Sequence, residues 1–292
     1  MKKNLPRWIG SSVPKCLAAW MALASASLHG QSISNASFEA NTFTAFPGYA
    51  SGNGGVITNW TLSNNTRIGL NPGGGTPFAN NGAIPTGSNV AFLQAGASGA
   101  ATMSQTVTGL TIGTKYHVEF RVNARNPNAP FLQFSTDAGE PAVSAQVTPV
   151  GGSNPYKYVG FDFTATATSH VINIANTITG GDHTLLVDDV TITTATGAWS
   201  FGPWQDDATS GVDSAYLYTH AVNFASSAAA NINGVPFIPR EFNIAGRFSA
   251  TGLDAGFGNR TPNNVTGNSA GLARDFRYNG NTGITLDNLK PN

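Results

Sequence analysis

The sequence predicts an all-β fold, an antiparallel β-sandwich, on three observations. Apolar and polar residues alternate with a period of two in several segments, helical periodicity is hard to find after the first 30 residues, and clusters of Gly, Asn and Pro separate the alternating segments. The 34 glycines and the hydrophobic content of 40% are typical of a glycine-rich β-protein and do not indicate disorder.

The clearest strand is KYHVEFRVNAR, residues 115–125, which places aromatic and aliphatic side chains on one face and polar side chains on the other. Further strands are expected to begin near Lys157, His170 and Thr184. The Gly- and Asn-rich stretch 71–89 is expected to be a surface loop without a regular element.

The first 26 residues have the pattern of a secretory signal peptide. Four basic residues accompany a short apolar run at 16–24, and Ala24-Ser25-Ala26 forms a small-x-small cleavage signal. We therefore expect a secreted or cell-surface protein; a disordered N-terminus of a cytosolic protein is the alternative. The only cysteine, Cys16, lies within this segment, so the mature chain is expected to have neither disulfides nor thiol chemistry.

The chain after the signal is expected to divide into a sandwich at 31–196 and a second β-rich unit at 197–292. The closing ITLDNLKPN repeats the beginning of VTGLTIGTKYHVEF from the first unit and then stops, which predicts a truncated second domain. Tyr216, Leu217, Val222 and Phe224 would then lie on strands with an unpaired edge. The alternative is a short appendage packed on the sandwich.

Charge and motifs exclude several classes of function. Removing the signal takes four of the 15 Lys and Arg residues and none of the 15 Asp and Glu, which leaves 11 against 15 and a net charge of −4. This balance argues against nucleic acid and anionic membranes as partners, and no later apolar run is long enough for membrane insertion. Catalytic and nucleotide-binding motifs are absent from the sequence, so we expect no enzyme.

Two adjacent carboxylates interrupt the strand-like LLVDDVTI at 185–192. One of Asp188 and Asp189 must share a face with apolar neighbours, and an ionised carboxylate on a core face is costly unless it is paired or bound to a metal. The alternative is that one aspartate faces solvent while the other caps a turn or pairs with Arg121 or Lys115.

Three motifs together resemble the jelly-roll carbohydrate-binding modules of bacterial secreted proteins, within the galactose-binding-like sandwiches. They are SISNASFEA at 32–40 with Trp60 some twenty residues on, GLTIGTKYHVEFRV at 109–122, and LLVDDVTI. The resemblance implies a structural calcium ion held by Glu39 and Asp188 or Asp189 with backbone carbonyls. Carboxylate and carbonyl oxygens are the ligands that calcium prefers. The second unit is similar to a segment that recurs in exported proteins of environmental bacteria, which implies no function.

Carbohydrate binding is the function that the resemblance implies, and the polar face of the central strand offers side chains for it. The candidate residues, expected on one face, are His117, Glu119, Arg121, Asn123, Gln133, Tyr158 and Asp162. Tyr49, Phe78 and Tyr156 are candidates for an aromatic rim, whereas Trp60 is expected in the core.

Three functions remain open from the sequence. The leading hypothesis is a non-catalytic, calcium-stabilised module of an exported protein that binds a polysaccharide or cell-surface glycan. The second is a structural or adhesive spacer that binds no sugar. The third is an accessory region of a glycoside hydrolase whose catalytic domain lies elsewhere.

Overall fold

The structure, a computed structural model, describes residues 31–43, 48–72, 81–96, 99–140, 142–195, 205–218, 221–223 and 230–239, together with four short strands after 247. The predicted signal peptide, Phe78 and Phe224 lie outside the described residues, as does most of the predicted second unit. Within the described part of the chain, no helix has the length and apolar character needed to cross a membrane.

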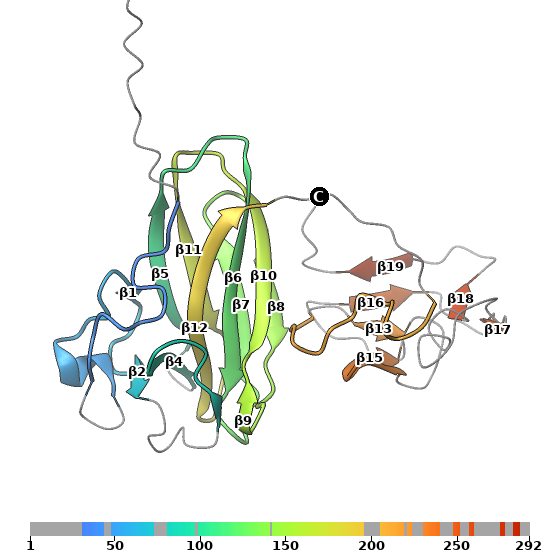
Figure 1. Ribbon diagram of the computed structural model, residues 1–292, viewed down its shortest axis with the longest axis horizontal. Coiled ribbons are helices and arrows are strands. Elements are labelled where there is room, and N and C mark those ends of the chain that lie inside the picture. Colours follow the sequence, from blue (N-terminus) through green and yellow to red (C-terminus); the bar gives the residue numbers. More distant parts are fainter. Residues whose placement is uncertain are drawn as a thin grey trace, which may run out of the picture.

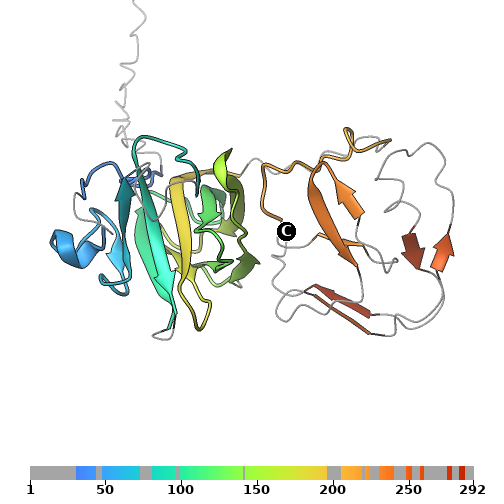
Figure 2. The ribbon, with the colours of Figure 1, turned by 90° about the horizontal axis from the view of Figure 1, so that it is seen from below.

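Two antiparallel five-stranded sheets pack face to face (Figure 1, Figure 2). The β6 sheet has the order β10 (Lys157–Thr164), β6 (Lys115–Ala124), β12 (His183–Thr194), β4 (Asn89–Ala95) and β2 (Ile68–Pro72). The β5 sheet has the order β1 (Thr61–Leu62), β5 (Ala101–Thr108), β11 (Ser169–Asn176), β7 (Phe131–Thr136) and β8 (Val143–Gln146). One short 3₁₀ helix, η1 (Ala50–Asn53), is the only helix among the described residues. The predicted antiparallel sandwich is confirmed.

Alternation along the strands builds the core between the sheets. On β6 every second residue from Tyr116 to Val122 is buried, while the intervening polar side chains face away from the β5 sheet; we call that side of the β6 sheet the outer face. Phe134 of β7 stacks on Phe161 of β10 with ring centroids 4.6 Å apart, so aromatic packing joins the two layers. Trp60 is 5% exposed and belongs to the core, as expected.

A β-bulge explains the adjacent aspartates. The pairing of β12 with β6 shifts between Asp188 and Thr191, and Asp189 has a left-handed φ of 54°. Before the bulge, Val187 faces the core and Asp188 the outer face; after it, Val190 faces the core again. The extra residue resets the alternation, so neither aspartate enters the core between the sheets.

The stretch 71–89 is more regular than the sequence predicted. Its first two residues end β2, its last begins β4, and Asn81–Ala83 forms β3, which pairs in parallel with β9 (Gly152–Pro155). The local composition concealed β3 because its partner strand lies some 70 residues later in the chain. Residues 73–80 are outside the described residues.

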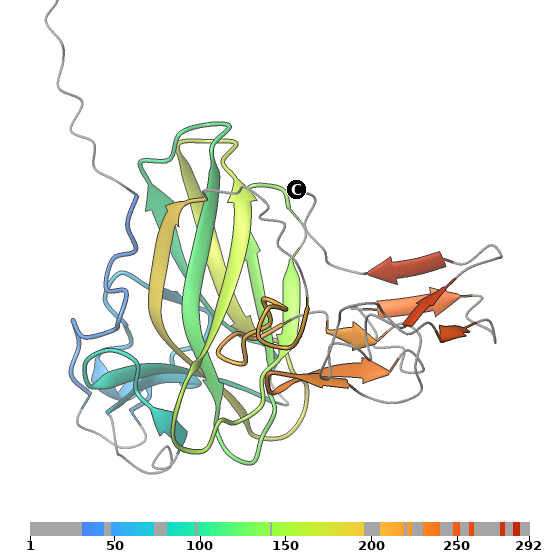
Figure 3. The same cartoon turned by 45° about the vertical axis from the view of Figure 1, so that its right-hand side comes forward.

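Residues 205–218 dock on the sandwich at the edge of β10 (Figure 3). The amide of Tyr158 donates to the carbonyl of Ala215 at 2.8 Å, and the amide of Leu217 donates to the carbonyl of Tyr158 at 2.8 Å. The Leu217 side chain also packs against the main core. The expectation that Tyr216 and Leu217 present an unpaired edge is therefore wrong, because an isolated parallel bridge and two backbone hydrogen bonds join them to Tyr158 at this edge.

The described strands beyond residue 218 are all short. They are β13 (Val222–Asn223), β14 (Ala230–Ile232), β15 (Val235–Pro239), β16 (Phe248–Thr251), β17 (Phe257–Asn259), β18 (Asp275–Arg277) and β19 (Gly283–Leu286). Asn233 and Gly234 join β14 to β15 with positive φ at both residues, the geometry of a two-residue hairpin turn. Val222 of β13 pairs with Ile238 of β15, so it too has a strand partner.

Candidate functional site

The strands β6 and β10 bring most of the predicted binding residues together on the outer face. Antiparallel pairing sets Tyr158 opposite Arg121 and Asp162 opposite His117, with Glu119 between them on β6. Gln133 lies elsewhere: it is on β7 in the other sheet, so the expectation that it shares this face is wrong. The alternation of FLQFST fixes which residues point outward but not which sheet contains the strand.

His117 is the centre of a polar network that reaches solvent. Its Nδ1 lies 2.6 Å from Asp162 Oδ1 and its Nε2 lies 3.8 Å from Glu119 Oε2, while Lys115 Nζ lies 3.4 Å from Asp162 Oδ2. About a third of each of these side chains is exposed. Gly160 leaves room for the imidazole, since a Cβ at that position would lie 2.5 Å from the His117 ring.

Aromatic side chains continue this network along the face. The Arg121 guanidinium lies over the Tyr158 ring, 3.2 Å from its centroid, and donates to the Tyr156 carbonyl at 3.1 Å and to the Tyr158 hydroxyl. Tyr216 lies beside Tyr158, with ring centroids 5.4 Å apart, and is 42% exposed. Partial burial, together with the charge of Glu119, raises the pKa of Tyr216. We call this set the β6–β10 surface; it comprises Lys115, His117, Glu119, Arg121, Tyr158, Asp162 and Tyr216.

Asn123 is not part of this surface, although its strand position predicted it. The side chain is fully buried: its Nδ2 donates to the Asn81 carbonyl, and its Oδ1 accepts from the amides of Val150 and Ala124 at 2.9 and 2.8 Å. Asn123 thus connects the sheet to the segments that cover it. Period-2 alternation identified the correct face but gave no information about what covers one end of it.

A small apolar cluster occupies the covered end. Its buried members are Val90, Phe92, Tyr156 and Leu186, with Tyr49 and Ile84 packed at the margin. Tyr156 was expected on a loop rim, but it is 2% exposed and burial raises the pKa of its hydroxyl. Tyr49 packs edge-on against Phe92 and donates to Gln94 at 2.6 Å. The open part of the outer face is therefore the β6–β10 surface.

Glu39 and Asp188 hold two ends of one tight segment, residues 86–89. Asp188 accepts from the amides of Thr86 at 3.1 Å and of Asp189 at 2.7 Å. Glu39 accepts from the amides of Ser88 at 3.0 Å and Asn89 at 2.7 Å. Between them Gly87 has a φ of 67°, and a Cβ there would meet the Glu39 carboxylate at 2.5 Å. Two of the three predicted metal ligands, Glu39 and Asp188, thus contact the same four-residue segment, whereas Asp189 does not.

Asp188 makes no salt bridge among the described residues, although Arg121 is its cross-strand partner on β6. Its side chain is fully buried, and burial raises its pKa to about 7, with the negative charges of Asp189 and Glu39 acting in the same direction. Arg121 contacts Tyr156 and Tyr158, and Lys115 pairs with Asp162. Pairing of an aspartate with one of these cations is therefore wrong, whereas the other branch of that alternative, a capping aspartate, describes Asp188, which accepts from backbone amides at 86 and 189 while Asp189 is half-buried.

These residues fit a calcium ion by the chemistry of their donors. No three His, Cys, Asp or Glu side chains within the described residues form a group that could hold a metal. Calcium, however, accepts backbone carbonyls beside one or two carboxylates. The turn at 34–40, which carries Glu39, lies against β12 directly after the two aspartates, since the amide of Val190 donates to the Ala36 carbonyl at 3.0 Å. Asn35 and Phe38 in that turn have left-handed φ values of 52° and 62°.

Sequence reasoning missed Tyr216 as a site residue. It belongs to SAYLYTH, where tyrosines recur at every second position, a signal of one exposed aromatic face. The segment was assigned to a separate unit, and nothing local in the sequence shows that it returns to β10.

One protein-family model matches this chain. The model described as HpiC1-like, HpiC1 cyclase, matches residues 30–200, more than half of the chain. No curated protein matches the sequence.

Several solved structures are similar in fold at low identity. An enzymatically active domain of tailspike protein 4 from bacteriophage CBA120 is 18% identical over 56% of this chain, with a TM-score of 0.37, and the match covers 21% of that domain. TmCBM61, solved with β-1,4-galactotriose, is 17% identical over 53% of this chain and 99% of that one, with a TM-score of 0.32. A family 35 carbohydrate binding module from Clostridium thermocellum is 15% identical over 47% of this chain and 92% of that one, with a TM-score of 0.33. At these values the likeness concerns the fold alone.

Proposed function

This chain belongs to the HpiC1-like family, and within that family we propose that it is a non-catalytic carbohydrate-binding module of an exported protein, stabilised by structural calcium. The observation that carries the proposal is the β6–β10 surface, where an exposed aromatic ring adjoins charged hydrogen-bonding groups.

The chemistry of this surface suits a polyhydroxyl ligand. A sugar ring has an apolar face that packs on an aromatic side chain and a rim of hydroxyls that accept and donate hydrogen bonds. Tyr216 offers the aromatic face, with 42% of its area exposed. Glu119 and Asp162 accept hydrogen bonds, and both lie on rigid strands, so little ordering is required on binding.

Calcium would serve the module as a structural ion. Glu39 and Asp188 would supply carboxylate oxygens, with carbonyls of the 34–40 turn completing the set, and the ion would offset the burial of Asp188. In a sandwich without disulfides this would join the opening segment to β12. Export, to the cell surface or beyond, is supported by the signal-like residues 1–26.

Retention in gels containing polysaccharide tests the proposal on the full chain. Glu119→Gln is a suitable variant, because Glu119 makes only a 3.8 Å contact with His117 and its loss should not disturb the fold. We expect retention on at least one plant or bacterial polysaccharide and a loss of about tenfold in affinity for the variant, or 1.4 kcal/mol. Wild-type chain that migrates freely through a broad panel would favour a structural or adhesive spacer.

Cyclase activity is a second candidate, favoured by the family and by one observation. Asp188 is a fully buried carboxyl on the outer face next to the apolar cluster that contains Leu186 and Tyr156. A carboxyl group in apolar surroundings can act as a general acid. The variant Asp188→Asn separates two roles of this carboxyl. If Asp188 is a calcium ligand, calcium stabilises the wild type but not the variant; if it binds no ion, calcium changes the stability of neither.

A further inference from the structure

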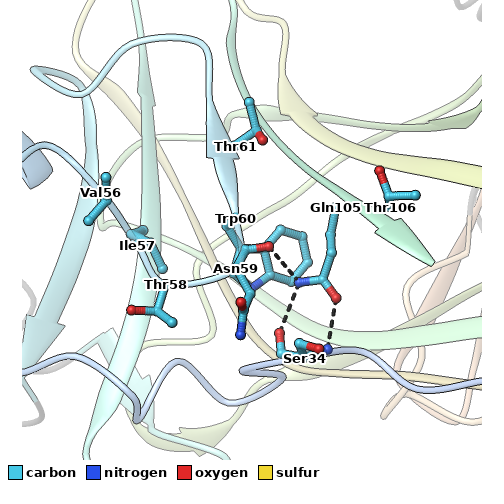
Figure 4. A pocket seen from close by; sticks show the side chains of 9 residues that line it. All are labelled: Ser34, Val56, Ile57, Thr58, Asn59, Trp60, Thr61, Gln105 and Thr106. Carbon is cyan, nitrogen blue, oxygen red and sulfur yellow. Dashed lines mark hydrogen bonds between the residues drawn. The ribbon is translucent and has the colours of Figure 1, made fainter. Parts of the chain in front are cut away.

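A hollow of about 570 Å³ lies at the edge of the β5 sheet, away from the β6–β10 surface (Figure 4). It is bordered by β1, by residues 56–60 before it, by the middle of β5 and by Ser34 of the opening segment. The volume falls within the range of small-ligand sites in proteins.

Buried polar bonds hold the walls of this hollow in place. Gln105 is 7% exposed; its Oε1 accepts from the Ser34 amide at 2.7 Å, and its Nε2 donates to the carbonyls of Ser34 at 2.9 Å and Asn59 at 3.0 Å (Figure 4). Trp60 is 5% exposed and donates from Nε1 to the Asn35 carbonyl at 3.2 Å. The floor therefore joins three chain segments rigidly, and a ligand meets a preformed site.

Above this floor the lining is polar, uncharged and free to bond. The side chains of Ser34, Thr58, Asn59, Thr61 and Thr106 are exposed, and none of them makes a hydrogen bond within the described part of the chain. Val56, 54% exposed, adds an apolar patch beside them. Among the described residues that line the hollow, none is acidic or basic.

We propose that this hollow is a second carbohydrate site, which takes a neutral sugar residue. Four hydroxyls and one amide can both donate to and accept from sugar hydroxyls, and Val56 offers contact to the apolar side of a ring. The absence of charge in the lining disfavours uronate or sulfated residues, whose desolvation would find no compensating cation. The β6–β10 surface, in contrast, carries Lys115 and Arg121, so the two sites differ in ligand charge.

Filling the hollow with a large side chain tests this inference. Thr106→Trp would occupy it, and Thr108→Trp is the matched control, since Thr108 is exposed on the same side of the same strand but does not line the hollow. Full chains are compared in native gels containing galactomannan or hydroxyethyl cellulose, which are neutral, and polygalacturonate, which is acidic. We expect about a tenfold loss of affinity for a neutral polysaccharide with Thr106→Trp and less than about twofold with Thr108→Trp.

A smaller substitution tests whether a loss of binding in Thr106→Trp comes from misfolding. Asn59 has a left-handed φ of 68°, so Asn59→Gly removes the amide while keeping a backbone conformation that glycine adopts freely. It should weaken neutral-polysaccharide binding about threefold with the melting temperature unchanged.

The β6–β10 surface provides the remaining control. In a chain that carries Glu119→Gln, the binding of neutral polysaccharide that remains should still be weakened by Thr106→Trp. Neutral binding that is lost with Glu119→Gln and indifferent to Thr106→Trp would overturn the second site and leave the proposed function standing. A wild-type chain that binds no neutral polysaccharide would also overturn the second site.

Discussion

Tyr216 lies beside Tyr158 across a parallel backbone bridge, with ring centroids 5.4 Å apart, although 58 positions separate the two residues in the chain. Arg121 covers the Tyr158 ring. The segment 213–218 thereby adds an exposed aromatic ring to the β6–β10 surface. That ring comes from outside the strands of the sandwich.

Removing the Tyr216 ring should therefore weaken glycan binding without unfolding the sandwich. For Tyr216→Ala we expect about a tenfold loss of retention in polysaccharide gels, because stacking on the exposed ring is lost. Tyr216→Phe keeps the ring and serves as the control, with retention close to wild type. Equal losses in both variants would mean that the hydroxyl, not the ring, contacts the ligand.

Calcium should raise the melting temperature of the chain, and EDTA should lower it. An ion that binds only the folded state stabilises it by about 2.7 kcal/mol at 100 times its Kd. Asp188→Ala should abolish this response, whereas Asp206→Asn, which changes a half-buried carboxylate outside the sandwich, should preserve it. Scanning calorimetry with and without calcium measures these melting temperatures. Identical curves for the wild type would show that the chain holds no stabilising calcium ion.

In EDTA, the stability of the chain should depend on pH through Asp188. Burial raises the pKa of this carboxyl to about 7, against about 3.9 in an unfolded chain. The folded state thus holds the proton more tightly, so this group favours folding at acidic pH and its contribution is lost as the pH rises from about 4 to about 7. Urea titrations at pH 5 and pH 7.5 should show a fall in the free energy of unfolding that is absent from Asp188→Asn. A fall of equal size in the variant would assign the effect to other groups.

The aromatic core should respond strongly to truncation. Phe134 is fully buried and stacks on Phe161, so Phe134→Ala is expected to cost about 3–5 kcal/mol in the free energy of unfolding. Ile112, 62% exposed, is the matched control, and Ile112→Ala should change stability by less than about 0.5 kcal/mol. Chemical unfolding followed by tryptophan fluorescence measures both.

The sequence predicted the strands well because alternation is a local property. The segments expected from residue 115, near Lys157, near His170 and near Thr184 are the strands β6, β10, β11 and β12. Trp60 was also placed in the core correctly. Each of these conclusions depends on backbone geometry within a few residues.

The candidate site was predicted in part. His117, Glu119 and Arg121 share a face because they are two residues apart on one strand, and Tyr158 and Asp162 join them through the pairing of β10 with β6. Gln133 was assigned to the wrong sheet, because the alternation within one strand does not specify which other strands pair with it.

What the sequence determined by itself is the all-β class, the faces of the strands and the oddity of two adjacent aspartates in LLVDDVTI. Only the tertiary structure decided that a bulge turns Asp188 to the outer face, that Asn123 is covered, and that Tyr216 returns to Tyr158. The reason is physical: side-chain direction follows from local backbone geometry, whereas burial and aromatic contact depend on which distant segments pack together, and that is settled by the free energy of the whole fold.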